Sequence, residues 1–237
     1  MKKCVVWIFG RGASVACGLS WEEPDEWKMK DRENRISKIE NTLRSEMDRA
    51  DTTVYRQLLS DLAARTSQHW HHSFVTTNWD FLLQREIERL SLVKLPAWLR
   101  NSHVFHLNGT VEKLKDNSNR SHFLLETDTP EYRGKTIEGQ VAFNHLIWQQ
   151  IFVVVGLSFR YGIDRTLLEA FNKIHDECPV GESDWIIVNP NDSDLRDAAR
   201  YVQKDLPCSC ICMLHMKFDD WLKHGMPQLQ KKGILVA

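Results

Sequence analysis

The segment from Val5 to Leu19, VVWIFGRGASVACGL, constrains the fold more than any other part of the chain. A short apolar run of strand type ends in a Gly-x-Gly-Ala-Ser turn, and a helix start rich in small residues follows. A backbone that passes close to a diphosphate needs glycine at Gly10 and Gly12 and small side chains at Ala13 and Ser14. The segment therefore predicts a strand, a phosphate-binding turn and a helix. A bulky side chain at Gly12 is expected to clash only with the ligand. The alternative is a tight turn that binds nothing.

The usual dinucleotide-binding fingerprint has a third glycine and an acidic residue about twenty positions further on. Val15 stands where that third glycine would fall, and no clear second strand follows Trp21. The segment is therefore a poor match to an ordinary dehydrogenase.

The charge balance limits the direct partners. The 31 basic and 32 acidic side chains nearly cancel, so neither nucleic acid nor a membrane surface is expected to bind directly. Two lysines and then only six apolar residues open the chain, too few for a signal peptide or a membrane span. A cytoplasmic protein is expected.

Strand-like and helix-like segments alternate along the 237 residues. This alternation predicts one α/β domain, residues 1–237, with a Rossmann-like parallel sheet and helices on both faces. Strands are expected over residues 5–9, 73–77, 103–107, 151–157, 185–188 and 209–214. Helices are expected over residues 54–64, 81–90, 139–150, 165–175 and 194–204.

The charged interval over residues 22–50 has apolar side chains at Ile36, Ile39, Leu43 and Met47, at steps of three and four. This spacing predicts an amphipathic helix, within a helical insertion at about residues 22–65. The helix either packs on its own domain or faces a partner.

The six cysteines include no Cys-x-x-Cys pair, whereas a structural zinc needs four ligands in paired spacing. Cys208, Cys210 and Cys212 alternate, which predicts that they share one face of a strand. Small buried thiols and no metal are expected for the whole set, which consists of Cys4, Cys17, Cys178, Cys208, Cys210 and Cys212.

Polar residues gather at other expected strand ends, where open parallel sheets place their ligands. VTTNWDFLL holds Asn78 and Asp80; one of them is expected to cap the following helix while the other faces the crevice. HVFHLNGT, VVVGLSFRYGID and IIVNPND end three further strands. In the last of these, Asn189 is read either as a ligand contact or as a plain turn residue.

The order GxGAS, TTNxD, a strand ending just before Gly109, GxSF and a strand ending in Asn resembles the sirtuin-like NAD-binding fold over about residues 5–221. It is most similar to the zinc-free, stand-alone branch of NAD-cleaving effectors in prokaryotic antiviral defence. The resemblance implies a Rossmann-like domain without the zinc-binding small domain. It also implies that NAD is bound in an inverted pose and cleaved to nicotinamide and ADP-ribose. Acyl-lysine deacetylation is the weaker possibility, because it needs the second small domain.

The resemblance also assigns binding residues. The diphosphate is expected at Gly10, Gly12, Ala13 and Ser14. The pocket for the nicotinamide ribose is expected at Thr76, Thr77, Asn78 and Asp80, and the adenosine half near Gly156, Ser158 and Asn189. Gly109 and Phe159 belong to the same expected set.

One departure from the family bears on catalysis. Asn108 stands where the family has the histidine that acts as general base, and an amide does not accept a proton at neutral pH. Asn78 is expected to hold the attacking water, so it should be needed for turnover more than for binding. His106 shares a strand face with Asn108, about 6.6 Å away along the strand, and either reaches the ribose through a water or packs on that face.

A second departure is Arg11, which replaces a small residue between the two glycines. It either contacts the diphosphate or points to solvent and pairs with a carboxylate.

Two functions of different class follow. The chain is an NAD glycohydrolase that a partner or self-assembly activates, or it is a catalytically degenerate subunit that binds NAD or ADP-ribose and regulates another protein. The family implies an Argonaute-like, helicase-like or nucleotide-hydrolase-like partner, or a homo-oligomer.

Overall fold

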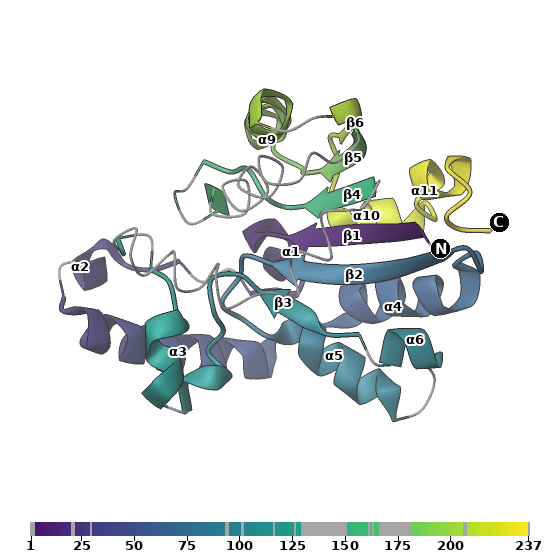
Figure 1. The fold of residues 1–237 in the computed structure, drawn as a ribbon. Helices are drawn as coiled ribbons and strands as arrows, with labels where there is room; N and C mark the ends of the chain where they lie inside the picture. Colours follow the sequence, from purple (N-terminus) through teal and green to yellow (C-terminus); the bar gives the residue numbers. More distant parts are fainter. Residues whose placement is uncertain are drawn as a thin grey trace.

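The computed structural model describes residues 3–128 except 20–21, 29, 93–94, 101, 116 and 126, residues 151–165 except 161 and 163, and residues 182–236 except 206–207 (Figure 1). The expected helix over residues 139–150 lies outside the described residues. So does all but the first residue of the helix expected over 165–175.

The described strands form one six-stranded sheet in which all pairings are parallel, in the order β3-β2-β1-β4-β5-β6. They are β1 (Lys3–Phe9), β2 (Trp70–Thr76), β3 (Val104–His106), β4 (Ile151–Val155), β5 (Ser183–Val188) and β6 (Cys208–Leu214). The strand predictions and the Rossmann-like α/β fold class are confirmed. The strand order reverses between β1 and β4. Connections leave the sheet in opposite directions at that point, which is where such sheets open a crevice at their carboxyl ends.

The central strand shows why the sheet is covered on both faces. Val5, Trp7 and Phe9 belong to one core cluster, whereas Val6 and Ile8 belong to another on the opposite face. Both sets are fully buried, as continuous apolar strands are in parallel sheets.

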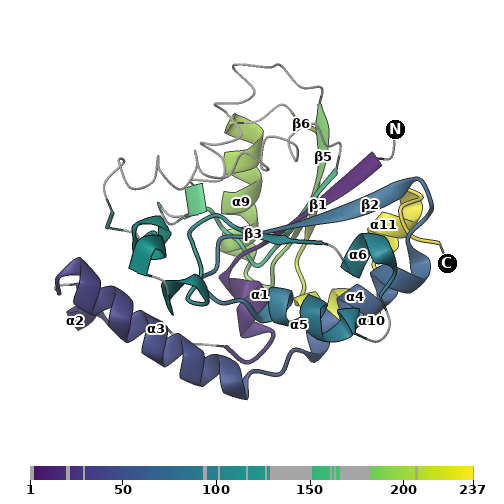
Figure 2. The ribbon, with the colours of Figure 1, turned by 60° about the horizontal axis from the view of Figure 1, so that its bottom comes forward.

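Helices cover the two faces (Figures 1 and 2). Apolar side chains of α4, α5, α10 and α11 join the core cluster that contains Trp7, and those of α9 join the cluster that contains Val6. The described helices are α1 (Arg11–Val15), α2 (Asp25–Lys28), α3 (Arg32–Arg49), α4 (Thr53–Arg65), α5 (Leu82–Ser91), α6 (Ala97–Arg100), α9 (Asp192–Asp205), α10 (Phe218–Lys223) and α11 (Pro227–Lys231), with short 3-10 turns η1 (Lys113–Lys115) and η2 (Asn117–His122). None of them is both long and apolar enough to cross a membrane.

The predicted amphipathic helix is α3, and its four predicted apolar residues are buried in the larger core cluster. Asp31 caps it by accepting a hydrogen bond from the Asn34 N–H at 3.1 Å. The helix therefore packs on its own chain, beyond the carboxyl ends of the strands (Figure 1).

The burial of the cysteines differs from the prediction. Cys4 and Cys17 are buried as predicted, but Cys210 is exposed and Cys208 and Cys212 are only half-buried. A register shift next to Ser183 makes Ser209 an extra residue in β6, so Cys208 packs with the α9 cluster and Cys212 against the opposite cluster. The prediction of one shared face and buried thiols is therefore wrong for this strand. Cys178 lies outside the described residues.

Candidate functional site

The turn after β1 contacts the turn after β4 through the backbone. The Gly10 N–H donates to the Val155 carbonyl, and the Gly12 N–H donates to the Gly156 carbonyl, both at 2.9 Å. Three glycines that the sequence placed in one binding site are therefore adjacent at the switch point of the sheet.

This contact explains why the positions are glycine. A Cβ atom on Gly12 would lie 2.7 Å from the Gly156 Cα atom, and a Cβ atom on Gly156, where φ is +64°, would lie 2.5 Å from the Gly12 Cα atom. The expectation that a side chain at Gly12 clashes only with a ligand is wrong, because the backbone of Gly156 already fills the space. The evidence for a ligand must therefore come from the side chains around these glycines.

Side chains from the turn after β2 reach this loop. The Asn78 amide donates to the Gly10 carbonyl at 2.9 Å and to the Ser14 hydroxyl at 2.8 Å. The Ser14 hydroxyl in turn donates to an Asp80 carboxylate oxygen at 2.6 Å, and the other Asp80 oxygen accepts from the Leu82 N–H at 3.1 Å. Asp80 thus binds the first N–H of α5 from the position before the N-cap residue, Phe81, which makes no side-chain cap bond, and it also anchors α1.

The hydrogen bonds within this network determine which of its polar atoms could still bind a ligand. Both amide protons of Asn78 are used within the protein, so its side-chain carbonyl oxygen is the polar atom outside these bonds. Asp80 is buried, and burial raises the pKa of its carboxyl group against the opposing effect of the hydrogen bonds from Ser14 and Leu82. The half-buried Asn78 is the member of the network that is open to solvent.

Thr76 and Thr77 stabilise the turn after β2 through hydrogen bonds. The Thr76 hydroxyl donates to the Phe9 carbonyl and accepts from the Asn78 N–H, both at 3.0 Å, while the Thr77 N–H also donates to the Phe9 carbonyl at 3.0 Å. Both threonines are buried. They hold the ends of β1 and β2 together and position Asn78.

Asn108 has a similar supporting contact. It is fully buried, and its amide donates to the Thr77 carbonyl at 2.9 Å. The following Gly109 has φ +80°, and a Cβ atom there would lie 2.6 Å from the His122 carbonyl oxygen. Both residues therefore fix the path of the chain beside the turn after β2.

His106 ends β3 opposite Thr76 of β2. Burial lowers the pKa of its imidazole to about 4, and the nearby Asn78 backbone opposes that effect. The ring is therefore neutral at neutral pH and lies against the backbone of the residue predicted to hold water.

Arg11 points to solvent and forms an ion pair with Glu22. Of the two arrangements that the sequence left open, the structure has the pairing with a carboxylate.

The remaining predicted residues make local contacts. The buried Ser158 hydroxyl accepts from the Arg160 N–H at 3.4 Å, and Phe159 is buried with φ +58°. Asn189 accepts from the Asn191 N–H at 2.9 Å, the contact of a plain turn. Ala13 is buried in α1.

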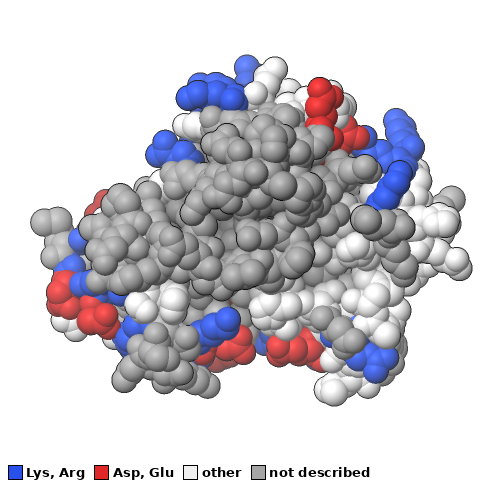
Figure 3. Space-filling view, in the orientation of Figure 1, with Lys and Arg blue, Asp and Glu red and all other residues white. Residues whose placement is uncertain are grey.

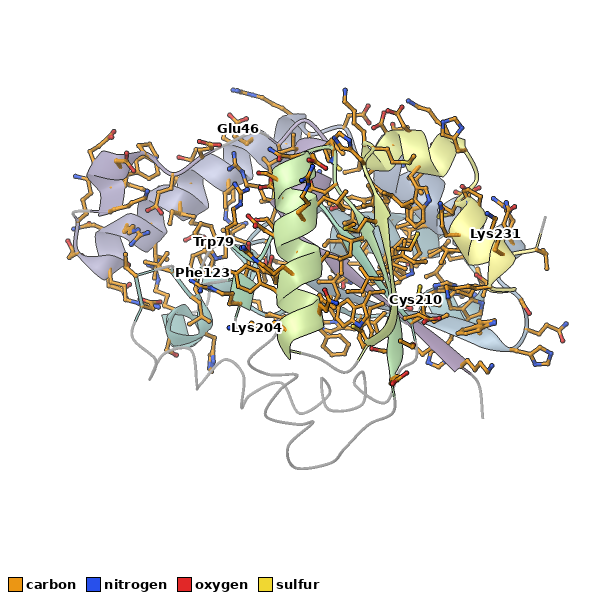
Figure 4. The ribbon with its side chains drawn as sticks, turned by 90° about the horizontal axis from the view of Figure 1, so that it is seen from above. Glu46, Trp79, Phe123, Lys204, Cys210 and Lys231 are labelled. Atoms are coloured by element: carbon orange, nitrogen blue, oxygen red, sulfur yellow. The ribbon has the colours of Figure 1, made fainter. Side chains whose placement is uncertain are left out.

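The sequence did not single out Trp79, which borders the site. Its indole N–H donates to the Leu124 carbonyl at 2.9 Å, and its ring centroid lies 5.2 Å from that of Phe123 (Figure 4). Its position between Asn78 and Asp80 was the sequence signal that could have identified it as a residue near the site. The pair holds the chain around residue 123 against the turn after β2.

One ion pair and one hydrogen bond then join this segment to α3. The buried Arg35 binds Glu23 and Thr127, and Arg32 binds Asp128 at 3.0 Å. No sequence signal pointed to these pairs, because charged residues on a helix usually face solvent. They hold Thr127 and Asp128 against the first turn of α3.

Among the described residues, no group of three or more His, Cys, Asp or Glu side chains could hold a metal ion. The face seen in Figure 3 carries both basic and acidic side chains on the described residues.

Compared with the models of known protein families and with curated proteins, the chain matches none.

Proposed function

We propose that this chain binds NAD at the carboxyl ends of β1, β2 and β4 and cleaves it to nicotinamide and ADP-ribose. The observation that carries the proposal is the network of Ser14, Asn78 and Asp80, which joins the turn after β2 to the turn after β1. It lies beside the switch point, where open parallel sheets bind nucleotides. Buried polar networks are costly unless every member is bonded, so a network at this place favours a site that must keep one shape.

The diphosphate would lie over the turn from Gly10 to Ser14. Arg11 is the cation at that turn. Its exposed ion pair with Glu22 contributes at most about 1 kcal/mol, so exchanging that carboxylate for a phosphate costs little. Arg11 would then support binding of the diphosphate without any change in the fold.

The reaction needs no strong base. As the bond between nicotinamide and the ribose breaks, nicotinamide leaves as a neutral molecule and positive charge develops on the ribose. Water adds to that carbon and releases one proton, which gives ADP-ribose. The Asn78 carbonyl oxygen is the group available to orient the water, and a closed site that excludes bulk solvent supplies much of the remaining acceleration.

Activation by a protein partner or by self-assembly belongs to the same proposal, as does a role as a cytoplasmic effector of antiviral defence. These parts depend on the resemblance to the sirtuin-like family.

A second function is favoured by one observation. Asn108 replaces the family's general base, and its amide is already used by the Thr77 carbonyl. A chain with this residue would bind NAD or ADP-ribose without cleaving it and regulate a partner protein.

The two functions separate in one assay. The purified protein is incubated with NAD, with and without the product of the neighbouring gene, and free nicotinamide is measured. Release by the parent chain supports the glycohydrolase. If the parent never releases nicotinamide but Asn108→His does, the pocket is competent and the natural chain is a binding subunit. Absence of both release and NAD binding contradicts both functions.

A further inference from the structure

The two edge strands of the sheet differ in how their outer backbone is protected. β3 has three residues, and the Val104 N–H, which points away from β2, donates to the Gln84 side chain at 3.0 Å. β6 has seven residues, and the sheet of the described residues ends there. A long edge strand is a template on which another strand can pair.

The sequence of β6, CSCICML, contains none of the charged residues or prolines with which edge strands usually prevent such pairing. Cys210 and Met213 are exposed, the latter at 51%. The bulge at Ser209 lies at the start of the strand, and from Cys210 to Leu214 the pairing with β5 runs without a break. This edge is therefore regular, uncharged and accessible.

The backbone contacts show which groups face outward. The Leu214 carbonyl accepts from the N–H of Asn189, the residue after β5, at 3.1 Å, so Leu214 and Cys212 direct their backbone groups toward β5. The residues between them alternate, so Ile211 and Met213 direct theirs to the outer edge. An added strand would hydrogen-bond at Ile211 and Met213.

We propose that the outer edge of β6 pairs, antiparallel, with β6 of a second copy of this chain. A two-fold axis at Ile211 uses the whole strand and places Ser209 opposite Met213 and Cys210 opposite Cys212. The patch is then the same on both copies, as a two-fold interface requires. The two sheets become one continuous sheet.

The charges at the two ends of the strand favour a second copy over an unrelated strand. Exposed Glu182 lies beside the start of β6, and exposed Lys217 follows its end. Antiparallel pairing brings each end beside the opposite end of the other copy, so unlike charges approach. The uncharged strand between them adds no repulsion.

The size of the contact sets the expected affinity. One pair of strands buries less than the roughly 800 Å² per partner of a standard interface. We therefore expect a micromolar dimer, visible as a rise in mass with concentration in sedimentation velocity. Met213→Lys places a charge on the edge and should shift the chain to monomer. Its thermal midpoint should equal that of the parent at concentrations well below the micromolar range, where the parent is also monomeric.

The cysteines give a test of the register. Cys210 and Cys212 would form a pair without hydrogen bonds between them, whose Cα atoms lie about 4.5 Å apart, within the range of a disulfide. In a background with Cys178→Ser and Cys208→Ser, mild oxidation should link two parent copies. In the same background, a chain that also carries Cys210→Ser should not link to a second copy of itself. Neither should a chain that instead also carries Cys212→Ser.

A mixture of the Cys210→Ser chain with the Cys212→Ser chain should link again, because each supplies the cysteine that the other lacks. Circular dichroism checks that all variants are folded. A chain that stays monomeric at high micromolar concentration overturns the proposal. So does linking of the Cys210→Ser chain to itself or of the Cys212→Ser chain to itself, or failure of the mixture to link while the parent does.

Discussion

The ends of β2 and β5 carry nearly the same residue types but use them in different ways. At the end of β2, the Asn78 side chain bonds Gly10 and Ser14, 68 and 64 positions away, and Asp80 bonds Ser14, 66 positions away. At the end of β5, the Asn189 side chain bonds a backbone N–H two positions along. Asn and Asp after a strand are typical both of a plain turn and of a binding site. The two strand ends differ in how far apart in the sequence the hydrogen-bonded residues lie.

The difference has an energetic basis. A local turn forms without closing a long loop of chain, whereas contacts between distant residues form only after folding has brought their strands together. Substitutions at the end of β2 should therefore affect the loop after β1, and those at the end of β5 should affect only α9.

The largest effect is expected for Gly12→Val. Its Cβ atom would lie 2.7 Å from the Gly156 Cα atom, and overpacking of this kind costs about 3 kcal/mol of unfolding free energy. Urea titration measures the loss. Gly233→Ala is the control, because Gly233 has φ +67° with nothing within 4 Å, so the variant carries backbone strain alone. Equal losses in the two variants would show that contact between the turns after β1 and β4 is unimportant.

Asp80→Ala should cost about 2–3 kcal/mol, because it removes the acceptor of the Leu82 N–H at the start of α5 and the acceptor of the buried Ser14 hydroxyl. Ser14→Ala should then cost less in the Asp80→Ala background than in the parent, since the hydroxyl there keeps only the hydrogen bond from the Asn78 amide. A double-mutant cycle from urea titrations measures the coupling. Additive losses would contradict the network.

Buried His72 predicts a pH effect away from both strand ends. It accepts from the Trp7 indole N–H at 2.9 Å and contacts the Thr66 hydroxyl at 3.0 Å, and burial lowers the pKa of its imidazole to about 3. The unfolded chain binds the proton first as pH falls, so stability is full above about pH 6.5 and decreases below it by up to about 1.4 kcal/mol per pH unit.

Urea titrations of the parent and of His72→Gln between about pH 7 and about pH 4 measure this slope. The variant should show a shallower slope, although His106 still contributes to it. The same slope in both proteins would contradict the assignment to His72.

The smallest effect is expected for Asn191→Ala. The Asn191 side chain accepts from the Ser193 and Asp194 N–H groups at 3.0 and 3.2 Å and so caps α9. Loss of the cap should cost about 1 kcal/mol. Thermal unfolding measures it. A loss as large as that of Asp80→Ala would remove the contrast between the two strand ends.

Periodic sequence signals predicted most of the fold. Buried parallel strands are short apolar runs, and the four apolar positions of α3 recur at helical spacing, so both are visible locally. The cysteines of β6 were misplaced because a bulge reverses the alternation after Ser209. Such a bulge depends on how β6 pairs with β5, and the sequence of β6 alone does not show it.

The site was predictable in part. The sequence placed Gly12, Asn78 and Asp80 at neighbouring strand ends, but it did not show that Gly156 requires glycine at position 12. Nor did it show that the Asn78 amide holds the loop after β1. Hydrogen bonds between side chains far apart in sequence follow from the topology, which residue spacing does not contain.

The central claim is that the end of β2 builds a dinucleotide site and the end of β5 does not. Calorimetry with NAD on the parent, Asn78→Ala and Asn191→Ala tests it most directly. Because the Asn78 amide holds the Gly10 carbonyl, we now expect Asn78→Ala to weaken binding at least tenfold, about 1.4 kcal/mol, and not only turnover. Asn191→Ala should bind NAD like the parent. No NAD binding by the parent, or equal binding by the parent and Asn78→Ala, would contradict the account.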